Sequence, residues 1–182
     1  MSSDQKIHIR ALEHSEWKNL RNVRLEAVTN HPNYFLSNPE QTKALSEKDW
    51  KRRIESNASR IFGLYNPSLK QCQLIGITGI FIPPEQQNTA CLVMSYIKPE
   101  YRGNGYSSMF FDARFDWALS NNTLEILKVC HREGNHPSQH AITKHGFKFI
   151  GKEQIEWPDG TIDTEYQYEL NLTALRNPHR MV

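Results

Sequence analysis

The segment 89–120 limits most strongly what this chain can fold into. Residues 89–97 form a near-continuous apolar run, which is typical of a central strand buried on both faces of a sheet. Gly103 and Gly105 follow in the connection, and residues 105–120 then carry apolar side chains at helical spacing. The sequence therefore predicts a buried strand that turns through a glycine-containing loop into an amphipathic helix.

This turn has the chemistry of a phosphate-binding site. Glycine lets backbone N–H groups come close to a ligand, and the first turn of a helix adds free N–H donors and the positive end of its dipole. A P-loop would need a Gly-Lys-Ser/Thr sequence, and no such lysine is present here. A dinucleotide-binding turn would need a third glycine where Ser108 stands and repeated strand–helix–strand units. Both of these alternatives are therefore disfavoured.

The remaining periodicities place further elements on both sides of this segment. A capping box at Ser46 and Asp49 starts one helix, and Pro158, Asp159 and Gly160 form a hairpin turn. Residues 32–44 are expected to be a loop. The predicted strands are 6–11, 60–65, 73–82, 89–97, 124–131, 147–157 and 161–170, and the predicted helices are 16–29, 47–56, 105–120 and a short one that starts at 136 and stops at 146. This order predicts an α+β domain with a mixed central sheet.

Length and charge exclude several classes of protein. A chain of 182 residues is expected to form a single domain, with a core of about 6–170 and a C-terminal tail, 171–182. The net charge of +2 argues against a dedicated nucleic-acid binder. The three scattered cysteines predict neither a disulfide framework nor a zinc site, and His136 and His140 lack a completing carboxylate, so we predict no metal. With neither a signal peptide nor an apolar membrane span visible, we expect a cytoplasmic protein.

Two motifs resemble those of the GNAT (N-acetyltransferase) superfamily. In the first, an Arg or Gln is followed by Gly and then by Gly or Ala at fixed spacing, and Arg102, Gly105 and Ser107 fill these positions. Ser107 departs from the pattern but is small. In the second, Asn135 precedes Gly146 by eleven residues, in an Asn-x-x-Ala/Ser element before a Gly-Phe pair. The resemblance covers about residues 6–170, is strongest at 90–151, and in its second motif is closest to the ribosomal-protein N-terminal acetyltransferase-like branch.

The resemblance implies a fold and an activity. The fold would be a GNAT-like three-layer α+β domain, with a central mixed, mostly antiparallel sheet flanked by helices. The activity would be direct transfer of an acetyl group from acetyl-CoA to a primary amine, either of a small molecule or of a protein or peptide N-terminus. The alternatives are a non-catalytic acetyl-CoA-binding sensor or structural protein, and a different acyl donor such as succinyl-CoA. The expected assembly is a monomer or homodimer, without nucleic-acid or membrane partners.

The same resemblance assigns the cofactor-binding residues. The central strand would splay from its neighbour, and its exposed backbone would pair with the pantetheine arm. Backbone N–H groups of the glycine loop would hold the pyrophosphate, and Asn135 would contact the cofactor through its side chain. The residues assigned to the cofactor are Ser95, Tyr96, Ile97, Arg102, Gly103, Asn104, Gly105, Tyr106, Ser107, Ser108, Asn135 and Ser138.

The catalytic assignments leave alternatives open. Ile142 stands where many members of the superfamily carry a tyrosine general acid, so the Ser138 hydroxyl is the candidate donor to the leaving sulfur; alternatively, Ser138 merely caps its helix. His131 and Glu133 are candidate general bases, with Tyr96 as a relay, and a water chain is the alternative.

The acceptor site is expected between the first two helices, the loop 32–44 and the hairpin near Trp157–Thr161. Acidic residues give the hairpin end a negative character that suits a cationic amine, although strand residues of this kind commonly face solvent. These acidic residues are Glu153, Glu156, Asp159, Glu165 and Glu169.

Overall fold

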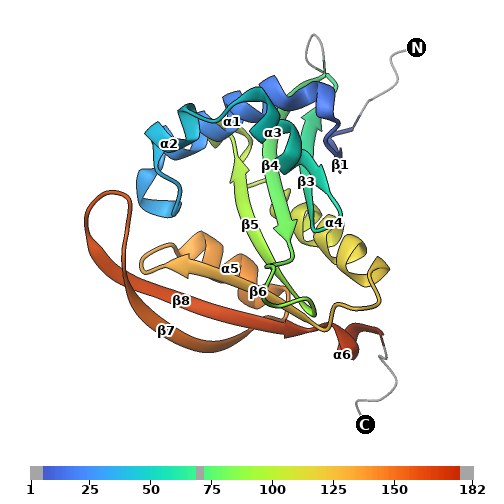
Figure 1. The fold of residues 1–182 in the computed structure, drawn as a ribbon, viewed down its shortest axis with the longest axis vertical. Helices are drawn as coiled ribbons and strands as arrows, with labels where there is room; N and C mark the ends of the chain where they lie inside the picture. Colours follow the sequence, from blue (N-terminus) through green and yellow to red (C-terminus); the bar gives the residue numbers. More distant parts are fainter. Residues whose placement is uncertain (1–5, 69–71, 177–182) are drawn as a thin grey trace.

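The computed structural model describes residues 6–68 and 72–176, and their strands form one sheet (Figure 1). The strands are β1 (His8–Ala11), β2 (Glu55–Ser56), β3 (Ser59–Asn66), β4 (Gln73–Phe81), β5 (Thr89–Ile97), β6 (Ile126–Arg132), β7 (Lys148–Glu156) and β8 (Ile162–Asn171). They are ordered β1-β3-β4-β5-β6-β8-β7, and β2 pairs with β3. The pair β5–β6 is parallel and the other described pairs are antiparallel.

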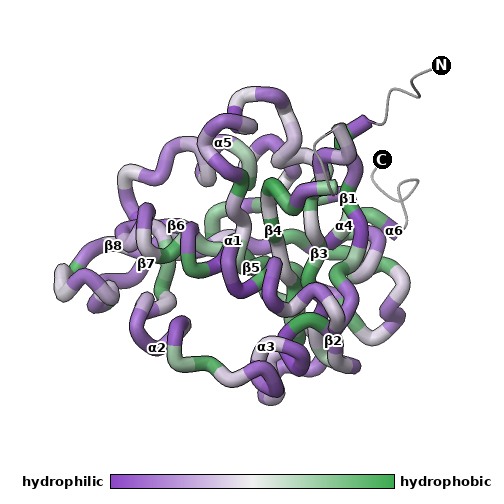
Figure 2. The backbone as a smooth tube through the Cα atoms, turned by 90° about the horizontal axis from the view of Figure 1, so that it is seen from above, coloured by the Kyte–Doolittle hydropathy of each residue, from purple (hydrophilic) through white to green (hydrophobic). Residues whose placement is uncertain are grey.

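Helices cover both faces of the sheet. They are α1 (Trp17–Asn30), α2 (Pro39–Lys43), α3 (Glu47–Ile54), α4 (Ser107–Ser120), α5 (His136–Lys144) and α6 (Leu172–Arg176), with short 3-10 turns η1 (His14–Glu16), η2 (Pro32–Tyr34) and η3 (Pro99–Tyr101). One core cluster joins α1 and α3 to the sheet through Leu20, Ile54 and Ile77, and another joins α4 and α5 through Phe111 and Ile142. Figure 2 shows α3 and α5 on opposite sides of the strands, with hydrophobic segments gathered along β3, β4 and β5.

The two strands at the centre of the sheet separate along their length. The β5–β6 ladder consists of the residues 89–91 paired with 126–128, and it stops after the pair Cys91 and Lys128. Farther along β5 the register against β4 shifts by a bulge, where Met94 has a φ of 61°. The C-terminal half of β5 therefore pairs with β4 on one edge, while its other edge is not paired with β6.

Three segments differ from the sequence-based expectation. The predicted helix 47–56 ends at Ile54, and Glu55 and Ser56 form β2. The predicted loop 32–44 contains α2, because the side chain of Asn38 accepts hydrogen bonds from Glu40 N and Gln41 N and Pro39 occupies the first helical position. The predicted tail begins with α6, whose Leu172 is fully buried. Residues 177–182 of that tail lie outside the described residues.

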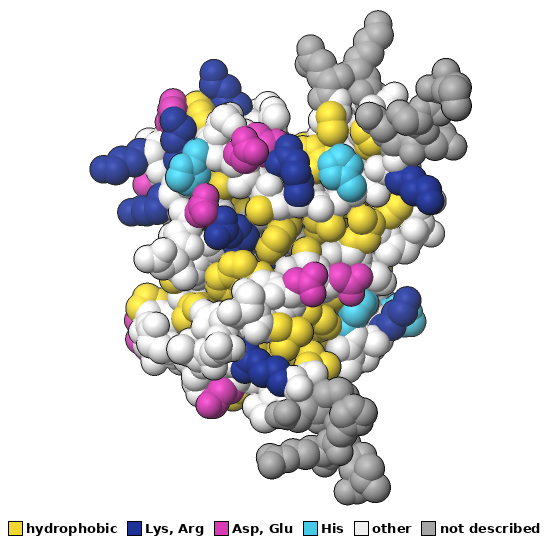
Figure 3. Space-filling model, turned by 90° about the vertical axis from the view of Figure 1, so that its right-hand side faces the viewer, with side chains coloured by type: hydrophobic (Ala, Val, Ile, Leu, Met, Phe, Trp, Pro, Cys, Tyr) yellow, Lys and Arg dark blue, Asp and Glu magenta, His cyan; other side chains and the backbone are white. Residues whose placement is uncertain are grey.

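A broad groove crosses the outer face between β1 and α4. Hydrophobic side chains gather on this face among charged ones (Figure 3). The groove has a volume of about 500 Å³, and its lining includes Ile9, Phe62 and Trp117 but no residue of β5 or of the glycine loop. It therefore does not belong to the candidate site. No helix among residues 6–68 and 72–176 combines the length and the apolar character that a membrane crossing requires.

Candidate active site

The glycine loop between η3 and α4 presents its backbone outward. Gly103 and Gly105 have φ values of 79° and 78°, and a Cβ atom added at either would meet nothing within 4 Å. Within the described residues, no acceptor is found for the backbone N–H groups of residues 103–107, whereas Ser108 N donates to Gly105 O at 3.1 Å. These free donors at the start of a fourteen-residue helix have the chemistry that a diphosphate requires.

The side chain of Arg102 turns away from this loop. Its Nε donates to Ile97 O at 2.8 Å, and one terminal nitrogen lies 3.0 Å from His31 Nε2. A guanidinium only donates, so His31 accepts through Nε2 and is neutral. Burial, and next the charge of Arg102, lowers the pKa of His31. Arg102 thus anchors the loop to the ends of β5 and α1.

Tyr96 on β5 is joined to a residue that sequence reasoning missed. The Tyr96 hydroxyl donates to Glu26 Oε1 at 2.9 Å, and Lys98 Nζ lies 3.2 Å from Glu26 Oε2. Burial, followed by the contact with Glu26, raises the pKa of Tyr96 to about 12, so the hydroxyl keeps its proton. The available sequence signal was weak: Glu26 lies at the edge of the apolar stripe of α1, next to Ala27.

Arg114, a second residue that sequence reasoning missed, contacts β5 at its bulge. Ser95 Oγ lies 3.0 Å from Thr78 Oγ1 and accepts from Arg114 on α4, also at 3.0 Å. Arg114 is 1% exposed, donates through Nε to Phe110 O, and has no ion pair with any described carboxylate. Burial lowers its pKa to about 9. A buried, uncompensated cation therefore supports the strand at its splayed end.

The second motif forms the start of α5. Asn135 is the N-cap, and its Oδ1 accepts from Ser138 N at 3.3 Å. Since Asn135 caps the helix, the Ser138 hydroxyl is not needed for that purpose, and it makes no hydrogen bond within the described part of the chain. Ile142 is 1% exposed and packs in the core, so this position faces away from the cleft.

The two predicted bases, His131 on β6 and Glu133 after it, are both hydrogen-bonded to other residues. His131 is buried, with Nδ1 2.8 Å from Arg132 O and Nε2 3.1 Å from the Tyr168 hydroxyl. Nδ1 donates to the carbonyl oxygen and Nε2 is hydrogen-bonded to the Tyr168 hydroxyl, so both ring nitrogens are engaged. Glu133 is exposed and accepts from the Tyr166 hydroxyl at 3.3 Å. This geometry favours structural roles for both residues.

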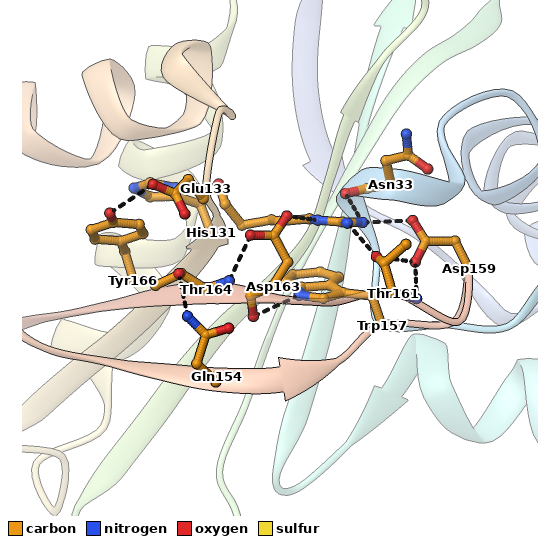
Figure 4. Close-up of polar contacts among 11 residues, drawn as sticks. Asn33, His131, Glu133, Gln154, Trp157, Asp159, Thr161, Asp163, Thr164 and Tyr166 are labelled. Atoms are coloured by element: carbon orange, nitrogen blue, oxygen red, sulfur yellow. Dashed lines mark hydrogen bonds and ion pairs between the residues drawn. The ribbon is translucent and has the colours of Figure 1, made fainter.

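The β7–β8 hairpin is held in place by Arg132, the last residue of β6. Figure 4 shows its partners Asp159, Thr161 and Asp163 on this hairpin. Arg132 donates to Asp163 Oδ2 and Asp159 Oδ2, each at 2.7 Å, and its guanidinium lies 4.9 Å from the centre of the Trp157 ring. The Thr161 hydroxyl, and next Arg132, lowers the pKa of Asp159 to about 2. The single charge of Arg132 therefore offsets one of these two carboxylate charges, which reduces the negative character expected of this end.

The sequence of the chain matches one protein family over most of its length. The matching family model is described as the acetyltransferase (GNAT) domain, and the match spans residues 6–148. The chain belongs to the GNAT acetyltransferase family. None of the curated proteins matches it significantly.

Solved structures share the GNAT fold of this chain. An acetyltransferase of the GNAT family from Streptococcus pneumoniae has a TM-score of 0.77 at 17% identity, covering 91% of this chain and 99% of its own. Spermidine N-acetyltransferase from Vibrio cholerae, in complex with CoA and spermine, has a TM-score of 0.73 at 19% identity and coverages of 93% and 98%. Ribosomal-protein-S5-alanine acetyltransferase from Vibrio fischeri has a TM-score of 0.75 at 13% identity and coverages of 93% and 95%.

These findings confirm the family and the α+β fold that the two sequence motifs predicted. The family match also confirms an acetyltransferase with acetyl-CoA as co-substrate. The neighbours of this GNAT chain include enzymes named for a polyamine and for a ribosomal protein, so their likeness does not select the acceptor. Within residues 6–68 and 72–176, no group of three or more His, Cys, Asp or Glu side chains gathers as a metal ion would require.

Proposed function

We propose that this GNAT chain transfers the acetyl group of acetyl-CoA directly to a primary amine in the cleft between β5 and β6. The observation that carries the proposal is the early end of the β5–β6 ladder at Cys91 and Lys128, next to a loop with free N–H groups. When bound, acetyl-CoA supplies an activated acyl thioester. The residues of the chain bind, orient and move protons around it.

Binding is assigned to backbone groups and to one amide. The N–H groups of residues 103–107 would hold the pyrophosphate, since they are free and lie at a helix start. The backbone of Ser95, Tyr96 and Ile97 would pair with the pantetheine arm, because this half of β5 has no partner in β6. Asn135 caps α5 through Oδ1, which leaves its Nδ2 to donate to the cofactor.

Tyr96 and Glu26 would remove the proton from the acceptor amine. Before the amine can attack, it must lose a proton to a group within hydrogen-bonding reach. The Tyr96 oxygen can accept this proton while its own proton passes to Glu26 Oε1, to which it is already hydrogen-bonded at 2.9 Å. We favour this pair over His131, whose ring nitrogens are both engaged.

Ser138 would donate to the sulfur that leaves. The thiolate needs a proton or a hydrogen-bond donor as the carbon–sulfur bond breaks. The Ser138 hydroxyl is half-buried at the first turn of α5 and makes no hydrogen bond with the described residues. It is therefore free to turn toward a ligand.

A thiol-release assay tests the proposed function. Protein is mixed with acetyl-CoA and pooled amines or N-terminal peptides, and free CoA thiol is measured against controls without amine. We expect amine-dependent release of thiol and a matching amount of acetylated product. Tight binding of acetyl-CoA without release in any pool would instead favour the sensor alternative.

A further inference from the structure

A small cavity lies on the α1 face of the sheet, over the bulge in β5. It is enclosed by α1, the segment around α2, and α3, and Met94 of the bulge contributes to its lining. Its volume is about 200 Å³, which is roughly that of seven water molecules. The cavity therefore adjoins the part of β5 where acyl transfer is proposed, on the side of the predicted acceptor site.

Arg24 of α1 is built into the wall of this cavity. Its side chain is 6% exposed, its guanidinium carbon lies 4.6 Å from the centre of the Phe35 ring, and one terminal nitrogen donates to Ser37 Oγ at 2.7 Å. The other terminal nitrogen, Nη1, is buried and has no partner among the described residues. Burial, and next the charge of Arg53, lowers the pKa of Arg24 to about 10, so Arg24 is a cation at neutral pH.

A second buried donor lines the same cavity. Trp50 of α3 is 1% exposed, and its Nε1–H has no partner within the described part of the chain. A buried donor without an acceptor costs about 1–3 kcal/mol, and a charged one costs more. Arg24 and Trp50 thus both line the cavity, and each carries a buried donor for which the described residues supply no acceptor.

The charge around the cavity is positive. Arg53 joins Arg24 in the lining, and no Asp or Glu is among the described residues that line it. The nearby carboxylates of α3 are engaged elsewhere, Asp49 with Ser46 and Arg52, and Glu47 with Lys51. An anionic group would therefore find charge and hydrogen-bond donors here, whereas a polyamine would meet like charge.

We propose that this cavity binds a carboxylate of the acceptor, so that the substrate is an amine that also carries a carboxylate, such as a free amino acid. The inference rests on the proposed acetyl transfer, because it takes the bulge of β5 as the place where the amine reacts. Arg24 brings to the lining a buried positive charge that forms no ion pair with a described carboxylate, and Arg53 adds a second one, which suits a carboxylate ligand. The volume suits a small amino acid.

The same chemistry can come from an acidic peptide N-terminus, and paired substrates separate the two sources. Thiol release is measured for amino acids against their carboxamides, for peptides beginning with Asp against Asn, and for spermidine. We expect kcat/KM for the best amino acid to exceed that of its carboxamide by on the order of 10-fold to 100-fold. The α-amino group of the carboxamide loses its proton more easily than that of the free acid. Amine reactivity alone would therefore favour the carboxamide, which is opposite to the expected preference. Equal rates for acid and amide, or a preference for spermidine, would overturn it.

Variants locate the preference in the cavity. Trp50→Phe removes one N–H while it preserves packing, and should reduce the acid-to-amide ratio several-fold. Arg24→Gln should bring the ratio close to one. Arg52→Gln is the matched control, because it removes an exposed arginine of α3 that does not line the cavity, and it should keep the ratio of the unmodified protein. A ratio that survives both Trp50→Phe and Arg24→Gln would place the carboxylate elsewhere.

Binding measurements separate failure of this inference from failure of the proposed function. Calorimetry with CoA-saturated protein compares an amino acid with its carboxamide without requiring turnover. Preferential binding of the acid that Trp50→Phe weakens supports the cavity assignment, even where no thiol is released. Equal binding of acid and amide overturns the assignment, even where acetylation of other amines proceeds.

Discussion

Substitution of Gly105 by Ala gives the sharpest test of the phosphate-binding loop. Gly105 has a φ of 78°, a region that side chains other than glycine rarely adopt, and an added Cβ would meet no protein atom within 4 Å. Gly160 in the β7–β8 hairpin has a φ of 79° and equally open surroundings. The two positions therefore share the same backbone strain and differ only in what is expected to bind above them.

The strain sets the size of the effect on stability. A left-handed alanine costs about 1–2 kcal/mol, which for a chain of this length lowers Tm by roughly 2–8 °C. Gly105→Ala and Gly160→Ala should both show this loss without ligand. At Gly105 the methyl group also takes up space that the diphosphate is expected to use, so CoA affinity should fall at least about tenfold, or about 1.4 kcal/mol.

Calorimetric titration with CoA and thermal unfolding without CoA measure both quantities. We expect Gly105→Ala to lose CoA affinity and Gly160→Ala to keep it, at similar values of Tm. If Gly105→Ala bound CoA as tightly as the unmodified protein, or if both variants lost affinity equally, the assignment of residues 103–107 to the pyrophosphate would be refuted.

Four further predictions follow from the contacts of single residues. Tyr96→Phe and Glu26→Gln should each lower kcat/KM by about 10²–10⁴ in the thiol-release assay, and the proton path proposed here fails if both retain full activity. Ser138→Ala should lower kcat by about 10² and leave the Kd of CoA unchanged in calorimetry; unchanged turnover would remove the proposed role. Arg114→Met should raise the free energy of unfolding by about 1 kcal/mol or more in denaturant titration, because it removes a buried charge without a counter-ion; a loss would show that its hydrogen bonds to Ser95 and Phe110 outweigh that charge. Asp159 has a pKa lowered from 3.8 to about 2, so its contribution to stability is present above pH 4 and lost as the pH falls toward 2. In acid unfolding, Asp159→Asn should make the free energy of unfolding depend less on pH over this interval. An unchanged pH dependence would contradict the Arg132 contact.

The local sequence carried enough information to predict the position of the glycine loop and most element boundaries. Gly103, Gly105 and the helix that follows are consecutive, so their backbone conformation and free N–H groups depend on a few neighbours. The helix α2 was missed because it has only five residues, a length at which an apolar period is not visible, although Asn38-Pro39 was a usable start signal.

The candidate base shows where residue type alone misleads. Histidine is a common general base in enzymes, which made His131 attractive for that role. In the fold its ring stacks against Tyr166 and Tyr168, with ring centres 5.4 Å apart in each case, and both nitrogens are hydrogen-bonded. The pairing of β6 with β8 brings the two tyrosines to His131. The residues next to His131 in the sequence do not indicate these contacts.

By itself, the sequence determined the family, the order of the main elements and the position of the glycine loop before α4, because each follows from residues close together along the chain. Tertiary structure alone decided which distant side chains share a site. Glu26 meets Tyr96 across 70 positions, and Arg24 meets Trp50 at a common cavity, because helices α1 and α3 pack on the same face of the sheet. Such contacts depend on how the helices dock, and the docking is set by the whole core rather than by any local pattern.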